Sequence, residues 1–152
     1  MASGLAEGAP ADQHALWNES GSWTVFVNAS VGNGCFIERQ TEDNTQIRLG
    51  YLPERLGGFF SVANPDWSEL EPGVTQEIAL FFDGATFSGE TEFFEEGGYF
   101  GGFSFFNNPN FLTDFAKRKK LTIVGPEGDK TIVDLTGTSR AINAMNTCQE
   151  AQ

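Results

Sequence analysis

Residues 23–51 read WTVFVNASVGNGCFIERQTEDNTQIRLGY, and this stretch indicates the fold class. Bulky apolar side chains alternate with smaller or polar ones in three short segments, and two polar turns separate the segments. A period of two places alternate residues on the same face of a strand, and short turns join antiparallel neighbours. The pattern predicts an antiparallel meander with one buried face, formed by Trp23, Val25, Val27, Ile47, Leu49 and Tyr51.

The remainder of the chain continues this architecture and adds two helices. Asp83-Gly84 is a strong two-residue hairpin signal, and a second hairpin is expected around residues 126–129. Apolar residues at helical spacing predict a short helix near residues 110–118 and a C-terminal helix near residues 139–150. The predicted fold class is α+β and predominantly antiparallel β, a sandwich or a partly open barrel of about 8 strands.

Length and composition fit one domain. At this length, 152 residues, folding buries roughly 70% of the surface that the unfolded chain exposes. We expect residues 21–152 to form a single β-rich domain, and residues 1–20, which lack apolar periodicity, to form a flexible N-terminal tail. The sequence has no run of eighteen apolar residues, so no membrane span is expected.

The charge is strongly acidic and unevenly distributed. Twenty-one Asp and Glu against nine Lys and Arg give a formal net charge of −12, which repels nucleic-acid phosphates and anionic lipid head groups. Residues 56–116 contain ten acidic residues and no Lys or Arg, whereas residues 117–120 hold four of the nine basic residues. We therefore expect no nucleic-acid partner. The acidic surface either binds a cationic partner or only keeps the protein solvated.

The two cysteines lie far apart, Cys35 in an expected strand and Cys148 in the expected final helix. A disulfide between them stabilises by roughly 4–5 kcal/mol in the chain-entropy treatment, and it requires an oxidising compartment. We predict this disulfide; the alternative is a pair of buried free thiols in a reducing compartment. The N-terminus lacks the basic and apolar regions of a signal peptide, so an exported protein is expected to start here at a mature end preceded by an added initiator Met.

The sequence contains no recognisable catalytic motif. The one histidine, His14, lies in the expected tail, so arrangements that depend on His lack a member. Glu92, Glu95 and Glu96 are more typical of a solvated turn than of an acid and base pair. Nucleotide-binding, calcium-loop and Cys/His metal patterns are also missing. We expect no enzymatic activity and no cofactor, and we assign no metal ligands; calcium around Asp83 or the Glu90 to Glu96 cluster stays an open alternative.

One segment, FFEEGGYFGGFSFF at residues 93–106, has an unusual composition. It contains six Phe, one Tyr and four Gly in fourteen residues. Rings offer large contact area with little rotamer entropy, and glycines permit close approach of a backbone or a ligand. The segment is either a binding surface or a strand pair with its rings in the core and its glycines at turns and bulges. The candidate surface residues are Phe93, Phe94, Tyr99, Phe100, Phe103, Phe105 and Phe106.

Four features of the chain occur in a recognisable order. They are Trp23 in the first strand, Cys35 in the second, the stretch from Trp67 to Gly73, and LTGTSRAINAMNTC at residues 135–148. This combination resembles the invasion-associated locus B type of small secreted proteobacterial proteins. The resemblance implies a periplasmic or secreted β-rich domain with an internal disulfide and without enzymatic activity. The Phe/Gly segment and the acidity depart from that pattern, and no functional residue carries over.

Together these observations favour a non-enzymatic extracytoplasmic binding or accessory domain, located in the periplasm or secreted. Its Phe/Gly-rich surface would contact a protein, a hydrophobic ligand or a second copy of the chain. The alternative is an acidic inhibitor or immunity-type protein that binds a cationic partner. Binding of that kind weakens steeply with salt.

Overall fold

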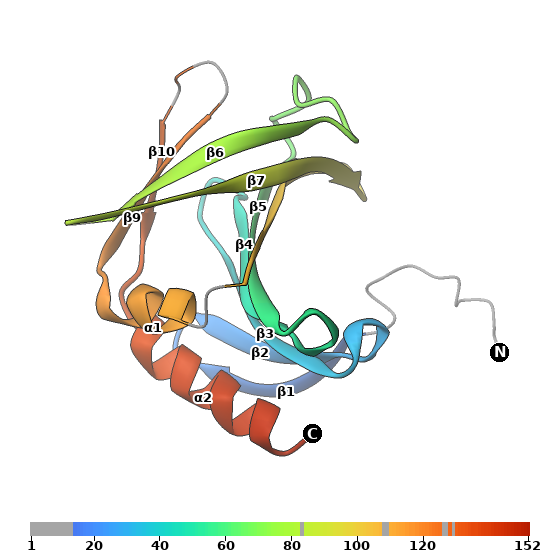
Figure 1. Cartoon of the computed structure of the whole chain (residues 1–152), viewed down its shortest axis with the longest axis vertical. Helices are drawn as coiled ribbons and strands as arrows, with labels where there is room; N and C mark the ends of the chain where they lie inside the picture. Colours follow the sequence, from blue (N-terminus) through green and yellow to red (C-terminus); the bar gives the residue numbers. More distant parts are fainter. Residues whose placement is uncertain (1–13, 83, 108–109, 126–127, 129) are drawn as a thin grey trace, which may run out of the picture.

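The computed structural model describes residues 14–82, 84–107, 110–125, 128 and 130–152. Its main element is one open antiparallel sheet with strand order β1-β2-β3-β4-β5-β8-β7-β6-β9-β10 (Figure 1). The strands are β1 (His14–Ser20), β2 (Trp23–Asn28), β3 (Gly34–Gln40), β4 (Gln46–Leu52), β5 (Gly57–Asn64), β6 (Thr75–Phe82), β7 (Ala85–Glu96), β8 (Tyr99–Phe106), β9 (Lys120–Val124) and β10 (Lys130–Asp134). The α-helices are α1 (Asn110–Lys117) and α2 (Thr138–Glu150).

Local hairpins build most of the sheet. Strands β1 to β5 form a meander in which each strand pairs with the next, and β6–β7, β7–β8 and β9–β10 are further antiparallel neighbours. Gly97 and Gly98 join β7 to β8 with φ of 61° and 88°. A two-residue type I′ hairpin turn requires positive φ at both positions, which glycine adopts freely. Two glycines of the Phe/Gly segment therefore close a hairpin.

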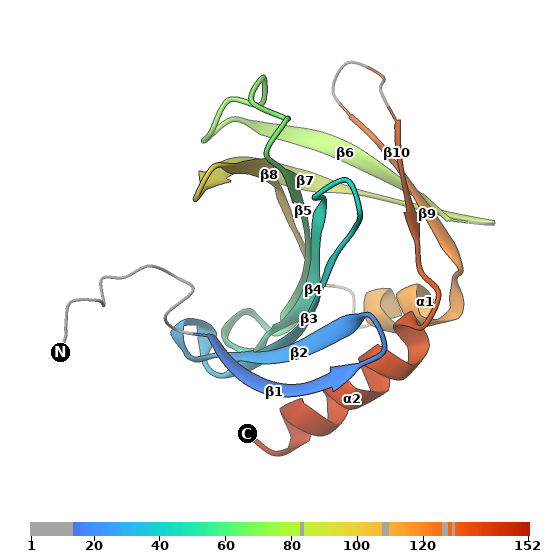
Figure 2. The same cartoon turned by 180° about the vertical axis from the view of Figure 1, so that it is seen from behind.

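The sheet is strongly curved, and both helices lie on the same face of it. In Figure 1, β1, β2 and β3 cross the lower part of the molecule, β4 and β5 run upward, and β6 and β7 cross the top; Figure 2 shows the same curve from behind. Helix α2 packs along β1, β2 and β3 and contacts α1. We call the helix-bearing face of the sheet the inner face and the opposite face the outer face.

The inner face carries the main hydrophobic core. Four of the residues predicted to be buried are at most 1% exposed, namely Trp23, Val25, Ile47 and Leu49. Val27 and Tyr51 are half-buried and pack against the same core, as does Trp67 from the connection between β5 and β6. The helices add apolar side chains from both α1 and α2: Phe111, Leu112, Phe115, Ala141, Ile142 and Met145.

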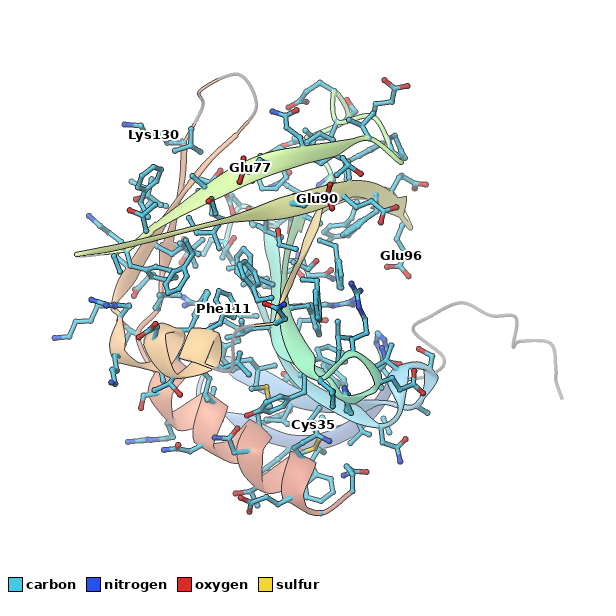
Figure 3. The ribbon with its side chains drawn as sticks, in the orientation of Figure 1. Cys35, Glu77, Glu90, Glu96, Phe111 and Lys130 are labelled. Carbon is cyan, nitrogen blue, oxygen red and sulfur yellow. A yellow bond between two sulfur atoms is a disulfide. The ribbon has the colours of Figure 1, made fainter. Side chains whose placement is uncertain are left out.

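A disulfide between Cys35 and Cys148 ties β3 to α2, and both cysteines are fully buried (Figure 3). Gln149 strengthens the same junction. Its side-chain carbonyl accepts a hydrogen bond from the Cys35 N–H at 2.8 Å, and its amide donates to the Asn33 carbonyl at 3.2 Å. The disulfide prediction is confirmed, and α2 is fastened to the sheet by covalent and polar contacts together.

The predicted fold class is confirmed, with two differences in detail. The sheet has ten strands and is a single open sheet, so the sandwich alternative is wrong. Residues 14–20, expected in a flexible tail, form β1; this strand pairs with β2 through its main chain while most of its side chains are exposed, so it lacks apolar alternation. Residues 1–13 lie outside the described residues.

Neither of the described helices is long and apolar enough to cross a membrane.

Candidate functional site

The seven candidate surface residues are divided between the two faces of the sheet. Successive side chains of a strand point to opposite faces. Phe103 and Phe105 pair with Ser61 and Phe59 and lie on the outer face, where both rings are half-buried. Phe106 faces the inner core and is 8% exposed. By the same alternation, the outer face holds Phe94, Tyr99, Phe103 and Phe105, and the inner face holds Phe93, Phe100 and Phe106.

Rings from four strands gather on the outer face. We call this group the aromatic stripe: Phe26, Phe36, Phe59, Phe103 and Phe105. Phe26 stacks on Phe36 with ring centroids 5.3 Å apart, and Phe59 stacks on Phe103 at 5.2 Å. Phe36 and Phe59 approach to 6.2 Å across Gly50, which lies between them in the sheet. A Cβ at Gly50 would lie 2.3 Å from the Phe36 Cβ, so glycine is needed for this close packing.

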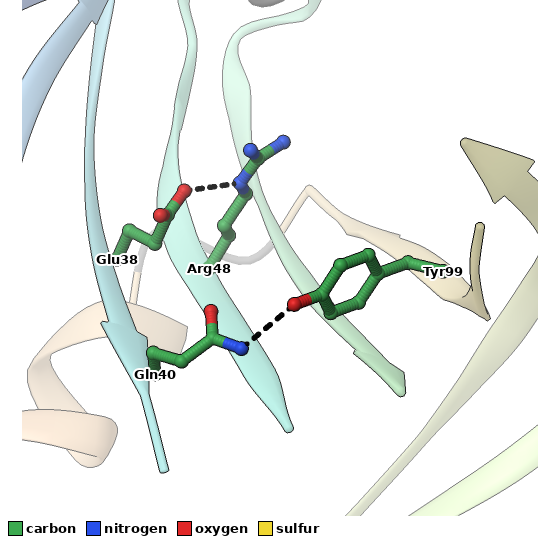
Figure 4. Close-up of polar contacts among 4 residues, drawn as sticks. All are labelled: Glu38, Gln40, Arg48 and Tyr99. Atoms are coloured by element: carbon green, nitrogen blue, oxygen red, sulfur yellow. Dashed lines mark hydrogen bonds and ion pairs between the residues drawn. The ribbon is translucent and has the colours of Figure 1, made fainter. Parts of the chain in front are cut away.

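Two arginines lie over the aromatic stripe. The Arg55 guanidinium is 3.8 Å from the Phe105 ring centroid, and that of Arg48 is 5.5 Å from the Phe36 centroid, both within cation–π range. The Arg48 Nε also donates to the Glu38 carboxylate at 2.7 Å (Figure 4). The terminal Nη atoms of Arg48 make no hydrogen bond to any residue that the structure describes. The aromatic stripe therefore carries cationic donors in an otherwise acidic protein.

A hydrogen bond crosses the outer face above the ends of β4 and β5. The Gln40 side-chain amide on β3 donates to the Tyr99 hydroxyl on β8 at 2.9 Å (Figure 4). In a flat sheet β3 and β8 would be three strand spacings, about 14 Å, apart. The outer face is therefore concave at this point. Ala63 on β5 is paired with Gly101 on β8, and a Cβ at Gly101 would lie 2.1 Å from the Val62 carbonyl oxygen.

His14 packs on the aromatic stripe and does not lie in a free tail. Its ring meets the Phe36 ring edge-on, with centroids 4.9 Å apart. Burial lowers the pKa of His14 from its ordinary value of 6.5, and the charge of Arg48 lowers it further, whereas Glu38 and Glu96 act in the opposite direction. The imidazole is therefore neutral at pH 7 and serves as an aromatic contact between β1 and the aromatic stripe.

The glutamates near the hairpin turn are not gathered into a catalytic pair. Glu92 and Glu96 lie on the outer face, while Glu95 lies on the opposite face by strand alternation. The Glu95 carboxylate accepts a hydrogen bond from the Gly98 N–H at 3.0 Å, which supports the turn. The described part of the chain contains no group of three or more His, Cys, Asp or Glu side chains that could hold a metal ion.

Acidic side chains follow the outer face of β6 and β7 (Figure 3). Glu77 and Glu90 are directly opposite each other in the strand register, and both are exposed. Like charges in directly opposed positions destabilise a sheet. Glu92, two residues further on, is opposite Phe103 of the aromatic stripe. Negative charge is therefore concentrated beside the aromatic stripe at a cost in local stability.

Sequence reasoning missed the contribution of Phe26, Phe36 and Phe59 to this surface. A signal for the first two was present, because inward Val25 and Val27 require Phe26 to face outward, and the same alternation applies around Phe36. Their proximity to the Phe/Gly segment was not readable. It depends on the pairing of β5 with β8, which are separated in sequence by all of β6 and β7.

The architecture just described is that of a small curved-sheet domain whose C-terminal helix is fastened by a disulfide. The crystal structure of invasion associated protein B from Bartonella henselae has the same fold: it matches 90% of this chain and 99% of that chain with a TM-score of 0.60 and 17% sequence identity. No protein-family model and no curated protein matches the chain. The resemblance inferred from Trp23, Cys35 and the C-terminal segment is confirmed for the fold.

Proposed function

We propose that this chain is a non-enzymatic extracytoplasmic binding or accessory domain that contacts a protein or a hydrophobic ligand through the outer face of its Phe/Gly-rich hairpin. The aromatic stripe carries this proposal. Its five rings cluster on the face opposite both helices, and three of them stay half-buried. Apolar surface gathered in one place is typical of interaction sites, whereas single exposed apolar residues are ordinary.

The chemistry around the aromatic stripe favours a protein partner. Interface cores are enriched in aromatic residues and Arg, and binding hot spots in Tyr, Trp and Arg. Arg48, Arg55 and Tyr99 lie among or beside the rings and supply donors within an apolar patch. A partner segment with apolar side chains and carbonyl or carboxylate acceptors would complement this arrangement.

The Cys35–Cys148 disulfide supports a periplasmic or secreted location, because structural disulfides persist in oxidising compartments and are rare in the cytosol. The test is an intact-mass measurement on protein taken from its native source, with free thiols alkylated before reduction. We expect no alkylation of either cysteine. Two alkylated cysteines would contradict the extracytoplasmic location.

Partner capture by matched baits tests the binding role. Immobilised wild-type domain is compared with a Phe103→Ser, Phe105→Ser bait in extracts of the periplasmic and secreted proteins of the source organism. An Ile132→Ser bait is the control, because Ile132 is 64% exposed and lies on β10, outside the aromatic stripe. We expect a partner retained by the wild type and the control but lost with the double variant, whose circular-dichroism spectrum shows that it stays folded. Equal retention by all three baits would contradict the proposal.

A second candidate is an acidic inhibitor of a cationic protein, and the Glu77–Glu90 pair favours it. A sheet that keeps like charges opposed loses stability there, and a cationic partner would offset the repulsion. This function predicts binding that weakens steeply between about 50 and 200 mM salt, because the Debye length falls to about 8–10 Å near physiological ionic strength. Glu77→Gln, Glu90→Gln should flatten the salt dependence; binding insensitive to salt would exclude this candidate.

A further inference from the structure

The inner face contains a cavity that the proposed function does not use. It has a volume of about 70 Å³ and lies between strands β5 to β10 and the connection from β5 to β6. No described residue of α1 or α2 lines it. Most of its wall is apolar, formed by Phe60, Val62, Trp67, Leu70, Ile78, Leu80, Phe93 and Ile123.

Small residues of the β7–β8 hairpin line part of the cavity. Gly102 is opposite Phe93, and Thr91 is opposite Ser104, all on the inner face. A Cβ at Gly102 would lie 2.6 Å from the Thr91 Cγ2, so even alanine requires a shift at this point. The Phe/Gly segment therefore contributes to both faces: its rings extend the aromatic stripe on one side, and Gly102 and Ser104 line the cavity on the other.

The polar atoms at the base of the cavity already have partners. The Thr91 and Ser104 hydroxyls hydrogen-bond to each other at 2.6 Å, and the Thr91 hydroxyl lies 3.4 Å from the Gly89 carbonyl oxygen. Both residues are buried, at 4% and 6% exposure. A buried water typically needs two to four polar partners, and cavities with apolar walls stay dry and accept apolar molecules. The interior therefore favours an apolar occupant.

The size of the cavity selects among apolar occupants. One water-sized group needs about 10–15 Å³ of such free space, so a cavity of about 70 Å³ holds roughly five such groups. Pockets for drug-sized molecules are about 300–1,000 Å³. The terminal part of an alkyl chain fits this space, and a fused ring system does not.

The charge at the wall restricts the head group of such a chain. Glu69 is the charged side chain among the described lining residues, and the whole chain carries a net charge of −12. An anionic head is repelled by both. We infer that this cavity binds the end of a single alkyl chain that carries an uncharged or cationic head group. The site is distinct from the aromatic stripe, so either one can fail its test without the other.

A chain-length series tests the alkyl specificity. Linear 1-alkanols from ethanol to decanol are titrated into the intact disulfide-bonded domain, and the amide signals of Gly102 and Ser104 are followed by ¹H–¹⁵N NMR. Affinity should rise about fourfold for each added methylene and level off at a chain length of roughly five carbons, when the cavity is full. Absence of saturable shifts at these residues across the series would overturn the inference.

Head-group preference is tested at constant chain length with hexanol, hexylamine and hexanoate. We expect hexanoate to bind several-fold more weakly than the other two, and Glu69→Gln to reduce that difference, since the charge that repels the carboxylate is removed. Tighter binding of hexanoate would identify an anionic lipid as the occupant and would contradict the inference.

A filling variant tests the location of the site. Val62→Phe places ring atoms in the cavity and should weaken hexanol binding at least tenfold, whereas Val27→Phe, at a half-buried core position that does not line the cavity, should leave it unchanged. Thr131→Phe, at a half-buried lining position on β10, serves as a second filling variant if Val62→Phe lowers the melting temperature. Wild-type affinity in a folded filling variant would overturn the assignment.

Discussion

The inner and outer faces of this sheet carry the same residue type in opposite surroundings. Phe106 stacks on Phe111 of α1 at a centroid distance of 3.9 Å, whereas Phe105, the preceding residue, lies on the outer face beneath Arg55. The two rings differ in environment because a strand alternates its side chains, not because their sequence context differs. A Phe-rich segment therefore cannot be assigned as a whole to the core or to the surface.

Removal of the disulfide should lower the free energy of unfolding the most. The disulfide fastens α2 to the inner face and makes no link to the outer face. The link joins residues 113 apart in sequence, and its removal should lower the free energy of unfolding by about 4–5 kcal/mol. Urea denaturation of a Cys35→Ala, Cys148→Ala variant against the oxidised wild type measures the change. A loss below about 1 kcal/mol would show that noncovalent packing alone holds α2.

The next largest effect should come from truncating two neighbouring rings, one on each face of the sheet, whose stability costs should differ. Phe106→Ala removes a ring buried against α1 and should cost about 3–5 kcal/mol, whereas Phe105→Ala should cost about 1 kcal/mol because that ring is only half-buried. Both values come from urea denaturation under one set of conditions. Equal losses would mean that the outer ring is as well packed as the inner one.

A methyl group at Gly101 should test how closely β5 and β8 pack beneath the concave outer face. Gly101→Ala forces a Cβ to 2.1 Å from the Val62 carbonyl oxygen, and we expect a loss of about 1–3 kcal/mol. Gly89→Ala is the matched control, because its Cβ would meet the Phe106 ring at an ordinary 3.4 Å. Melting curves for the pair should rank Gly101→Ala as clearly less stable, and the reverse order would refute the close approach.

The smallest predicted effect is a change in the pKa of His14, which lies where the outer face is only partly shielded from water. NMR titration should give a pKa for His14 below 6.5, and Arg48→Met should raise it by removing a positive charge. The folded state favours the neutral imidazole, so His14 adds to the free energy of unfolding above pH 6.5. This contribution is lost as the pH falls through the lowered pKa. A wild-type pKa above 6.5 would place His14 away from the aromatic stripe and Arg48.

Local patterns were sufficient to predict much of the fold. Alternation identified the meander from β2 to β4, the spacing of Phe111, Leu112 and Phe115 identified α1, and the pair Cys35 and Cys148 located the disulfide. Strand β1 was missed because it is held by main-chain pairing at the sheet edge and buries little of its own side chains. An exposed edge strand leaves no apolar period to detect.

The candidate site was predictable only in part. The composition of the β7–β8 hairpin identified its rings as candidate surface residues. Their clustering with Phe26, Phe36 and Phe59 depends on strand order. Placing β8 beside β5, rather than β6, is a long-range choice that no turn or local period specifies. The cavity was hidden for the same reason, since its wall combines six strands and the connection that carries Trp67.

Solvent access to individual Phe rings tests the division between the two faces most directly. The protein is labelled with 4-fluorophenylalanine, each ¹⁹F signal is assigned by a single Phe→Leu substitution, and line broadening by a soluble gadolinium complex is measured. We predict clear broadening for Phe103 and Phe105 and little for Phe106 and Phe111. Equal protection of all four rings would contradict an accessible aromatic stripe on the outer face.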